Sequence, residues 1–268
     1  DAQKLVDYTA GDSLPLSSRP IPSNHFIFPL PEQTSDSTTF YIKYQGQASS
    51  FLPVELVNST DYIDHFDNEL LSFGLIIGML LAVGLYNLVI YWVTKETSYF
   101  HFCAYLVLTI FLLCSLEGYS AVYLWPNMAW LQNTLLPSTF TLALYFCLQF
   151  TYYSFGLNRE SSPINKTFKW LGISLLVISL LILVLPAYFS ILIAALSVAS
   201  VPLIVISIII KLHLHRRDLA NLYLLGWLIL TTGLLFSASH FSGLLIIGAV
   251  PQTPLKTAML GQILIFAL

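Results

Sequence analysis

Two ionisable side chains lie inside long apolar runs, Glu117 and His240. Ionisable groups are costly in an apolar environment and by default mark a functional site. Helices that end near residues 122 and 242 would place both side chains in the outer third of a membrane. We hypothesise that they face each other or a shared outward-opening cavity, where a histidine beside a carboxylate gives a contact sensitive to protons or ligand. The alternative is that both are hydrated near the interface and have no specific role.

The other reactive residue types give weaker signals. His213 and His215 are two positions apart, so they do not share a helix face, and we predict no metal site. Lys256 invites comparison with retinal-binding proteins, but it lies at the mouth of its apolar run and no embedded aspartate is available as counter-ion. The three cysteines lie in apolar runs without CxxC spacing, which indicates ordinary packing (Cys103, Cys114 and Cys147). Because hydrolase, nucleotide-binding and kinase signatures are absent, we predict no enzymatic activity and no cofactor.

A third candidate feature is a stripe of small residues spaced by four, Gly74, Gly78 and Ala82. Small residues let another helix approach closely. The stripe therefore predicts either a homodimer interface or packing within one bundle, and the sequence leaves both open. Asn87 on the same run predicts a hydrogen bond between helices.

Composition places these residues in a membrane protein. Of 268 residues, 56% are hydrophobic and 9% are charged, against roughly 25% charged residues in an average soluble domain. This excludes a soluble enzyme, a disordered chain and a nucleic-acid-binding protein. A spanning helix needs about 20 apolar residues. We predict such helices at 71–94, 99–122, 132–154, 169–186, 188–210, 220–242 and 255–268, the last one cut short by the end of the sequence.

Charge predicts the orientation of the helices. Basic residues are retained in short cytoplasmic loops. Past residue 69 they fall in or beside alternate loops: Lys95, Arg159, Lys166, Lys169, Lys211, Arg216 and Arg217. Lys256 is the exception. We therefore expect a multi-pass protein with the N-terminus outside the membrane and the C-terminus in the cytoplasm.

Residues 1–68 differ from the rest of the chain. Residues 1–69 carry three basic and ten acidic side chains, whereas residues 70–268 carry eight basic and four acidic ones. Short apolar runs at 25–30, 39–45 and 52–57 alternate with turn residues, which is typical of an antiparallel β-sandwich. We predict two domains: residues 1–68 form the C-terminal part of an extracytoplasmic β domain, and residues 69–268 form the helical bundle.

Several motifs together resemble the bacterial seven-transmembrane receptors with diverse intracellular signalling modules. The resemblance lies in GDSLPLSSRPIPSNHFIFPL (11–30), TTFYIKYQG (38–46), GLIIGMLLAVGLYNLVIYW (74–92), SYFHFCAYL (98–106) and EGYSAVYLWPN (117–127). It covers most of the chain up to the third helix. It implies the end of an extracellular jelly-roll sensor domain before a seven-helix bundle.

The resemblance also implies a function. In a bacterial inner membrane, a periplasmic domain would recognise a small, carbohydrate-like ligand. The bundle would pass the signal to a cytoplasmic histidine kinase, diguanylate cyclase or phosphatase, which this chain does not contain. The alternative is a transporter or membrane-embedded enzyme that uses Glu117 and His240 as coupling or catalytic groups.

Overall fold

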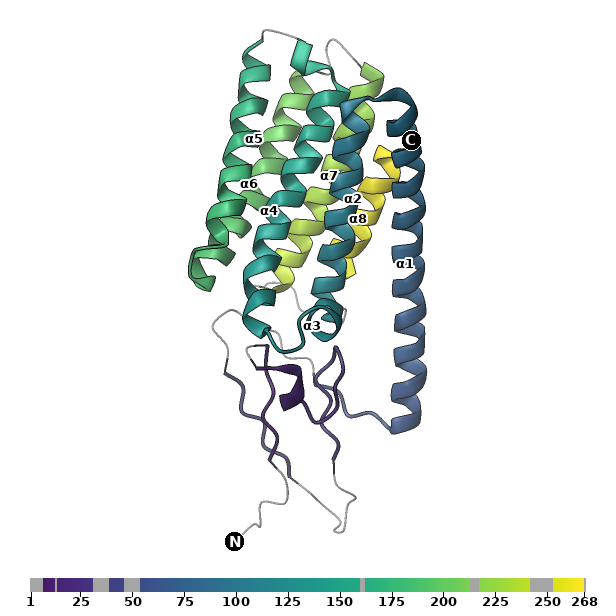
Figure 1. Cartoon of the computed structure of the whole chain (residues 1–268), viewed down its shortest axis with the longest axis vertical. Coiled ribbons are helices and arrows are strands. Elements are labelled where there is room, and N and C mark those ends of the chain that lie inside the picture. The colour runs from purple at the N-terminus through teal and green to yellow at the C-terminus, as the bar shows by residue number, and fades with distance from the viewer. Residues whose placement is uncertain are drawn as a thin grey trace.

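The structure is a computed structural model and describes residues 7–12, 14–30, 39–45, 54–159, 162–212, 217–241 and 253–267. The long helices among these residues pack side by side as a bundle and run nearly parallel to one axis (Figure 1). In chain order they are η1 (Leu16–Ser18), α1 (Ser59–Thr94), α2 (Thr97–Leu116), α3 (Tyr119–Tyr123), α4 (Ala129–Ser154), η2 (Leu157–Arg159), α5 (Pro163–Ile182), α6 (Ala187–Leu212), α7 (Arg217–Phe241) and α8 (Thr253–Phe266).

Six of these helices are long and apolar enough to cross a membrane: α1, α2, α4, α5, α6 and α7. The protein is therefore a multi-pass membrane protein. The seventh predicted span corresponds to α8, whose 14 residues are too few for a bilayer of about 30 Å. The prediction of seven spans is thus confirmed for six.

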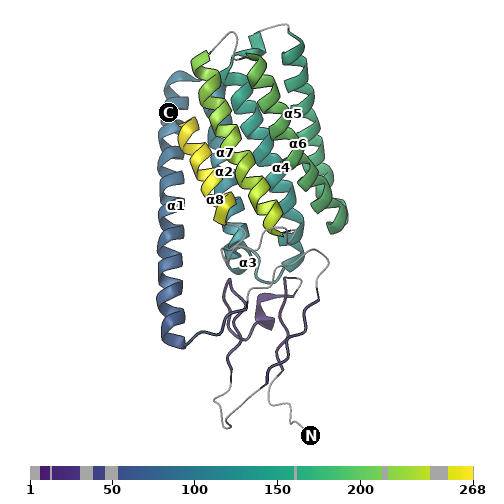
Figure 2. The same ribbon diagram turned by 180° about the vertical axis from the view of Figure 1, so that it is seen from behind.

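Helix α4 lies at the centre of the bundle and packs against α2, α5 and α6. Helix α8 lies along α7, between α7 and α1, as Figure 2 shows from behind. The N-terminal segment, residues 7–12, 14–30 and 39–45, lies at one end of the bundle, which we call the near end. The turn between α1 and α2 at Lys95 lies at the opposite end, the far end.

Helix α1 is longer than the sequence predicted. It begins at Ser59 instead of residue 71, and its 36 residues exceed what a bilayer requires. Its first turns carry acidic side chains and extend past the bundle beside the N-terminal segment (Figure 1). The hydropathy pattern marked where the apolar part begins, whereas the helix itself continues into polar residues because polar side chains do not end a helix.

The predicted helix 99–122 is broken, which corrects the sequence-based boundary. Helix α2 ends at Leu116, Glu117 follows as its cap, and Gly118 has a φ of 78°. Only glycine adopts this left-handed conformation without strain. The chain then resumes as the short helix α3, so the two parts point in different directions.

The expected strands are not confirmed. In the described parts of residues 25–30, 39–45 and 54–57 the backbone has no strand pairing. Alternating apolar side chains remain exposed there, including Tyr41, Ile42 and Leu56. Alternation predicts a half-buried strand, but a strand forms only where a neighbouring segment supplies hydrogen bonds.

Helices α7 and α8 are held together through glycines. A Cβ on Gly233 would overlap the Ala258 side chain and approach the Pro254 carbonyl oxygen, and one on Gly226 would overlap the Phe266 ring. The absence of side chains at these two positions lets α8 lie close to α7. The apolar face of α8 is buried in this contact (Leu255, Ala258, Met259, Ile263 and Phe266).

We predict that Gly233→Ala destabilises the bundle, because the added methyl group forces α8 away from α7. Overpacking of this kind costs about 1–3 kcal/mol. The matched control is Gly78→Ala on α1, where a Cβ meets no atom within 4 Å. Thermal unfolding in detergent should show a lower midpoint for Gly233→Ala and no loss for Gly78→Ala. Equal midpoints would contradict the close packing of α7 and α8.

Candidate functional site

The N-terminal segment is fastened to the turn that ends α2. The side-chain amide of Asn24 donates a hydrogen bond of 3.1 Å to the backbone oxygen of Glu117. Beside it, a Cβ on Gly118 would lie 3.1 Å from the Asn24 backbone oxygen. The left-handed glycine therefore both turns the chain and leaves room for Asn24. Asn24 of the segment thus packs directly against Glu117 and Gly118 at the end of α2.

Arg19 shapes the loop that presents Asn24. Its guanidinium donates to the backbone oxygen of Ser23 and lies 4.2 Å from the centroid of the Phe26 ring. Burial lowers the pKa of Arg19, and the charge of Asp12 acts in the opposite direction. An arginine remains protonated at neutral pH despite such a shift. The loop is thus held by a cation that stays charged.

A buried ion pair lies directly behind this contact. The Glu117 carboxylate pairs with the ammonium group of Lys256, and their side chains are 8% and 17% exposed. Lys256 lies in the first turn of α8. The pair therefore joins the end of α2 to the start of α8. Removing one partner of a buried pair is strongly destabilising, because the other charge is left without compensation.

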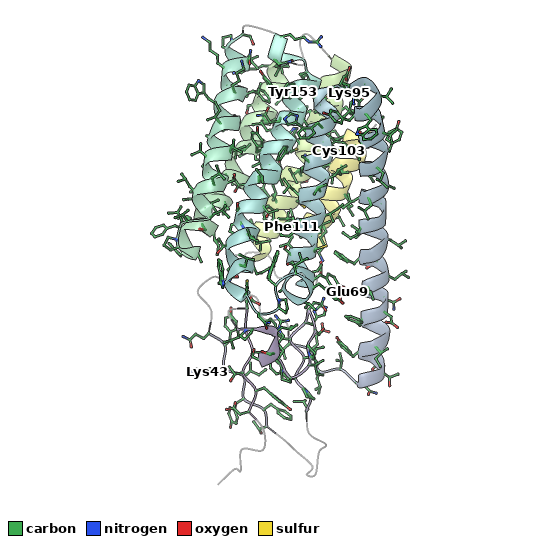
Figure 3. All side chains as sticks on the ribbon, in the orientation of Figure 1. Lys43, Glu69, Lys95, Cys103, Phe111 and Tyr153 are labelled. Carbon is green, nitrogen blue, oxygen red and sulfur yellow. The ribbon has the colours of Figure 1, made fainter. Side chains whose placement is uncertain are left out.

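A second polar contact connects the segment to α1. The Nε2 atom of His25 lies 3.2 Å from a carboxylate oxygen of Glu69, and both side chains are partly exposed. Glu69 lies on α1 at the level of the near end (Figure 3). The neighbouring residues Asn24 and His25 thus contact α2 and α1.

Gln132 organises the polar groups around α3. Its side-chain oxygen accepts from Ser120 at 2.6 Å and from the Trp125 indole at 3.1 Å, and its amide donates to the Ser115 backbone oxygen at 2.7 Å. The backbone amide of Leu16 donates to the Pro126 oxygen at 2.8 Å. Helices α2, α3 and α4 and the N-terminal segment are therefore joined at the near end.

The described part of the chain contains small cavities. One, of about 30 Å³, lies between the segment and the α3–α4 region, with Arg19, Trp125 and Gln132 in its lining. Another, of about 20 Å³, lies inside the bundle beside Tyr105, Cys147 and Met259. Such volumes hold a water molecule or two and are far below the roughly 300 Å³ of a typical ligand pocket.

A buried polar chain in the bundle interior includes α8. The Tyr105 hydroxyl donates to Gln262 at 2.8 Å, and the Gln262 amide lies 3.4 Å from the Cys147 sulfur. The Trp227 indole donates to the Thr151 hydroxyl at 3.1 Å. Helix α8 is thus bonded to α2 and α4 in the middle of the bundle as well as to α2 at the near end.

The structure brings Glu117 to an ion pair with Lys256. The predicted partner His240 lies near the end of α7, but its side chain is outside the described residues, so the predicted pairing stays a prediction. His213 and His215 also lie outside them. Within the described residues, no group of three or more histidine, cysteine or acidic side chains could hold a metal.

The predicted packing residues lie on α1. Gly74, Gly78 and Ala82 are exposed, and no atom lies within 4 Å of a Cβ at either glycine, so the stripe faces away from the bundle. The buried amide of Asn87 donates to the Val83 oxygen of its own helix, one turn earlier. The predicted dimer interface therefore stays a prediction.

Sequence reasoning missed Lys256, Glu69 and Asn24 as parts of this site. Lys256 did carry a signal, because it breaks the pattern of basic residues at the cytoplasmic ends of helices. An unlike charge embedded at the same end of the bundle is its natural partner. Asn24 gave no comparable signal, since polar residues are common in external loops.

We predict that Gln132→Leu destabilises the near end, because the partners of Gln132 lose their hydrogen bonds. Each buried group left unsatisfied costs about 1–3 kcal/mol. Asn133→Leu is the matched control, because the side-chain amide of Asn133, next to Gln132 in the sequence, is exposed. Thermal unfolding in detergent should separate the two variants. A loss in Asn133→Leu as large as that in Gln132→Leu would contradict the network.

Comparisons with known proteins agree with the site's location between two units. A family model described as "7TM diverse intracellular signalling" matches residues 69–268. A second, described as "7TMR-DISM extracellular 2", matches residues 1–58. No curated protein and no solved structure matches the chain. The two matches indicate a transmembrane signalling receptor, and they confirm the resemblance found in the sequence. The chain belongs to the 7TM diverse intracellular signalling family.

Proposed function

We propose that this protein is the sensing and transmembrane part of a bacterial receptor that detects a small periplasmic ligand and acts on a cytoplasmic signalling module. The observation that carries the proposal is the contact of Asn24 and His25 with both α2 and α1. A change in the N-terminal segment would reach the membrane helices directly. In the proposed receptor the ligand is carbohydrate-like, and the output is a histidine kinase, diguanylate cyclase or phosphatase.

The proposed mechanism begins at α1. Its first residue, Ser59, directly follows the extended residues 54–58, and the helix is continuous through Glu69 to Thr94. A continuous helix transmits a displacement along its length without the slack of a flexible linker. Ligand binding would favour one of two positions of α1 against the bundle.

The proposed orientation puts the near end outside an inner membrane. Basic side chains at Lys95, Arg159 and Lys211 belong to the far end, whereas the first turns of α1 are acidic. Retention of basic residues in the cytoplasm then makes the far end cytoplasmic. Figure 3 labels Lys43 and Lys95 at opposite ends of the molecule.

The transporter or embedded-enzyme alternative has less support. It requires Glu117 to serve a substrate or a coupling ion, but the carboxylate is paired with Lys256. The two cavities described above also have volumes of only about 20 and 30 Å³. In contrast, a signalling receptor requires no cavity within its bundle.

We predict that cysteines introduced at Lys43 and Lys95 are labelled from opposite sides of the membrane. The native cysteines are first replaced by alanine, and sealed right-side-out vesicles are treated with a membrane-impermeant maleimide. Lys43→Cys should react in sealed vesicles, whereas Lys95→Cys should react only after the membrane is opened. Labelling of both variants in sealed vesicles would contradict the topology.

The sensing role predicts a ligand-dependent change at the far end. Spin labels at Lys95→Cys and Arg159→Cys report the distance between the end of α1 and η2. In lipid nanodiscs this distance should shift when glucose, maltose, cellobiose or N-acetylglucosamine is added.

Deletion of residues 1–58 should abolish the shift and leave an inserted protein. The same shift without residues 1–58 would contradict sensing by the N-terminal segment. The absence of a shift with every saccharide would contradict a carbohydrate-like ligand.

A further inference from the structure

The N-terminal segment contacts α2 at a place that also anchors α8. Asn24 bonds the backbone of Glu117, and the side chain of the same residue pairs with Lys256. A displacement of Asn24 therefore moves the residue whose carboxylate holds the first turn of α8. Because the two contacts share one residue, only the Glu117 backbone and side chain lie between the segment and α8.

The pair is well placed to transmit such a displacement. Both side chains are largely buried, so water cannot replace either partner at low cost. Glu117 therefore joins Asn24 of the segment directly to Lys256 in the first turn of α8.

Helix α8 is held at two places along its length. One face is buried against α7, and Gln262 bonds Tyr105 of α2 in the bundle interior. Gln262 lies six residues after Lys256, about 9 Å along the helix. A helix does not stretch along its axis. A displacement of Lys256 therefore also displaces Gln262, unless the hydrogen bond of Gln262 to Tyr105 holds the helix in place.

We propose that the Glu117–Lys256 ion pair couples the N-terminal segment to α8, by a route that is separate from α1. The inference rests on the proposed receptor function and adds a second helix that responds to the segment. The segment acts on α1 through His25 and Glu69 and on α8 through Asn24 and Glu117. Glu117 and Lys256 are positioning residues in this route.

The test measures hydrogen exchange of the α8 amides from Thr257 to Leu260 in the full chain in lipid nanodiscs, without ligand. Asn24→Ala should make these amides exchange about fivefold faster, the change expected for one lost hydrogen bond. In the Glu117→Gln/Lys256→Gln background, which has no unpaired charge, the same change at Asn24 should have no effect. Ser18→Ala, which removes an exposed hydrogen bond within the segment, is the matched control and should leave α8 unchanged.

Two results would overturn the inference. One is unchanged α8 exchange in Asn24→Ala, and the other is an equal increase with and without the ion pair. Neither result affects the saccharide response at Lys95, which tests the receptor function separately. An unchanged saccharide shift after deletion of residues 1–58, with the exchange result intact, would overturn sensing by the segment and leave the coupling.

Discussion

A charged group inside an apolar bundle must have a partner, and the pairing of Glu117 with Lys256 is the interaction on which the near end depends. It brings the end of α2 to the start of α8. The turn at Gly118 then directs α3 sideways, so that the Glu117 backbone oxygen is open to Asn24. The contact between segment and bundle follows from where this one carboxylate lies.

The rest of the bundle is held by close packing and buried hydrogen bonds. Helix α4 packs against α2, α5 and α6, and the missing side chains of Gly226 and Gly233 bring α8 against α7. The interior polar groups bond one another, as Tyr105 and Gln262 do. The signal is expected to enter at the N-terminal segment, which contacts both α2 and α1, and to travel as helix displacement.

Much of the bundle could be predicted because twenty-residue apolar runs have one stable form in a membrane. The start of α1 at Ser59 and the break at Gly118 could not, since hydropathy reports lipid contact and not the backbone. Glu117 was identified because a carboxylate in an apolar run is unusual. The partner of Glu117, Lys256, was not identified. The direction in which Glu117 points depends on how α2 is rotated about its own axis, and a helix that is apolar on all sides has no periodic sequence pattern that reveals this rotation. The external strands remain a prediction. An alternating pattern of apolar residues does not show which segment would pair with a strand.

The most direct measurement is a double-mutant cycle for Glu117→Gln and Lys256→Gln, with unfolding free energies determined in lipid. If the pair organises the near end, each single variant leaves a buried charge unpaired and costs about 3–5 kcal/mol. The double variant then costs much less than the sum of the two single variants. A double variant whose cost equals that sum would show that the two residues act independently, and it would contradict the account.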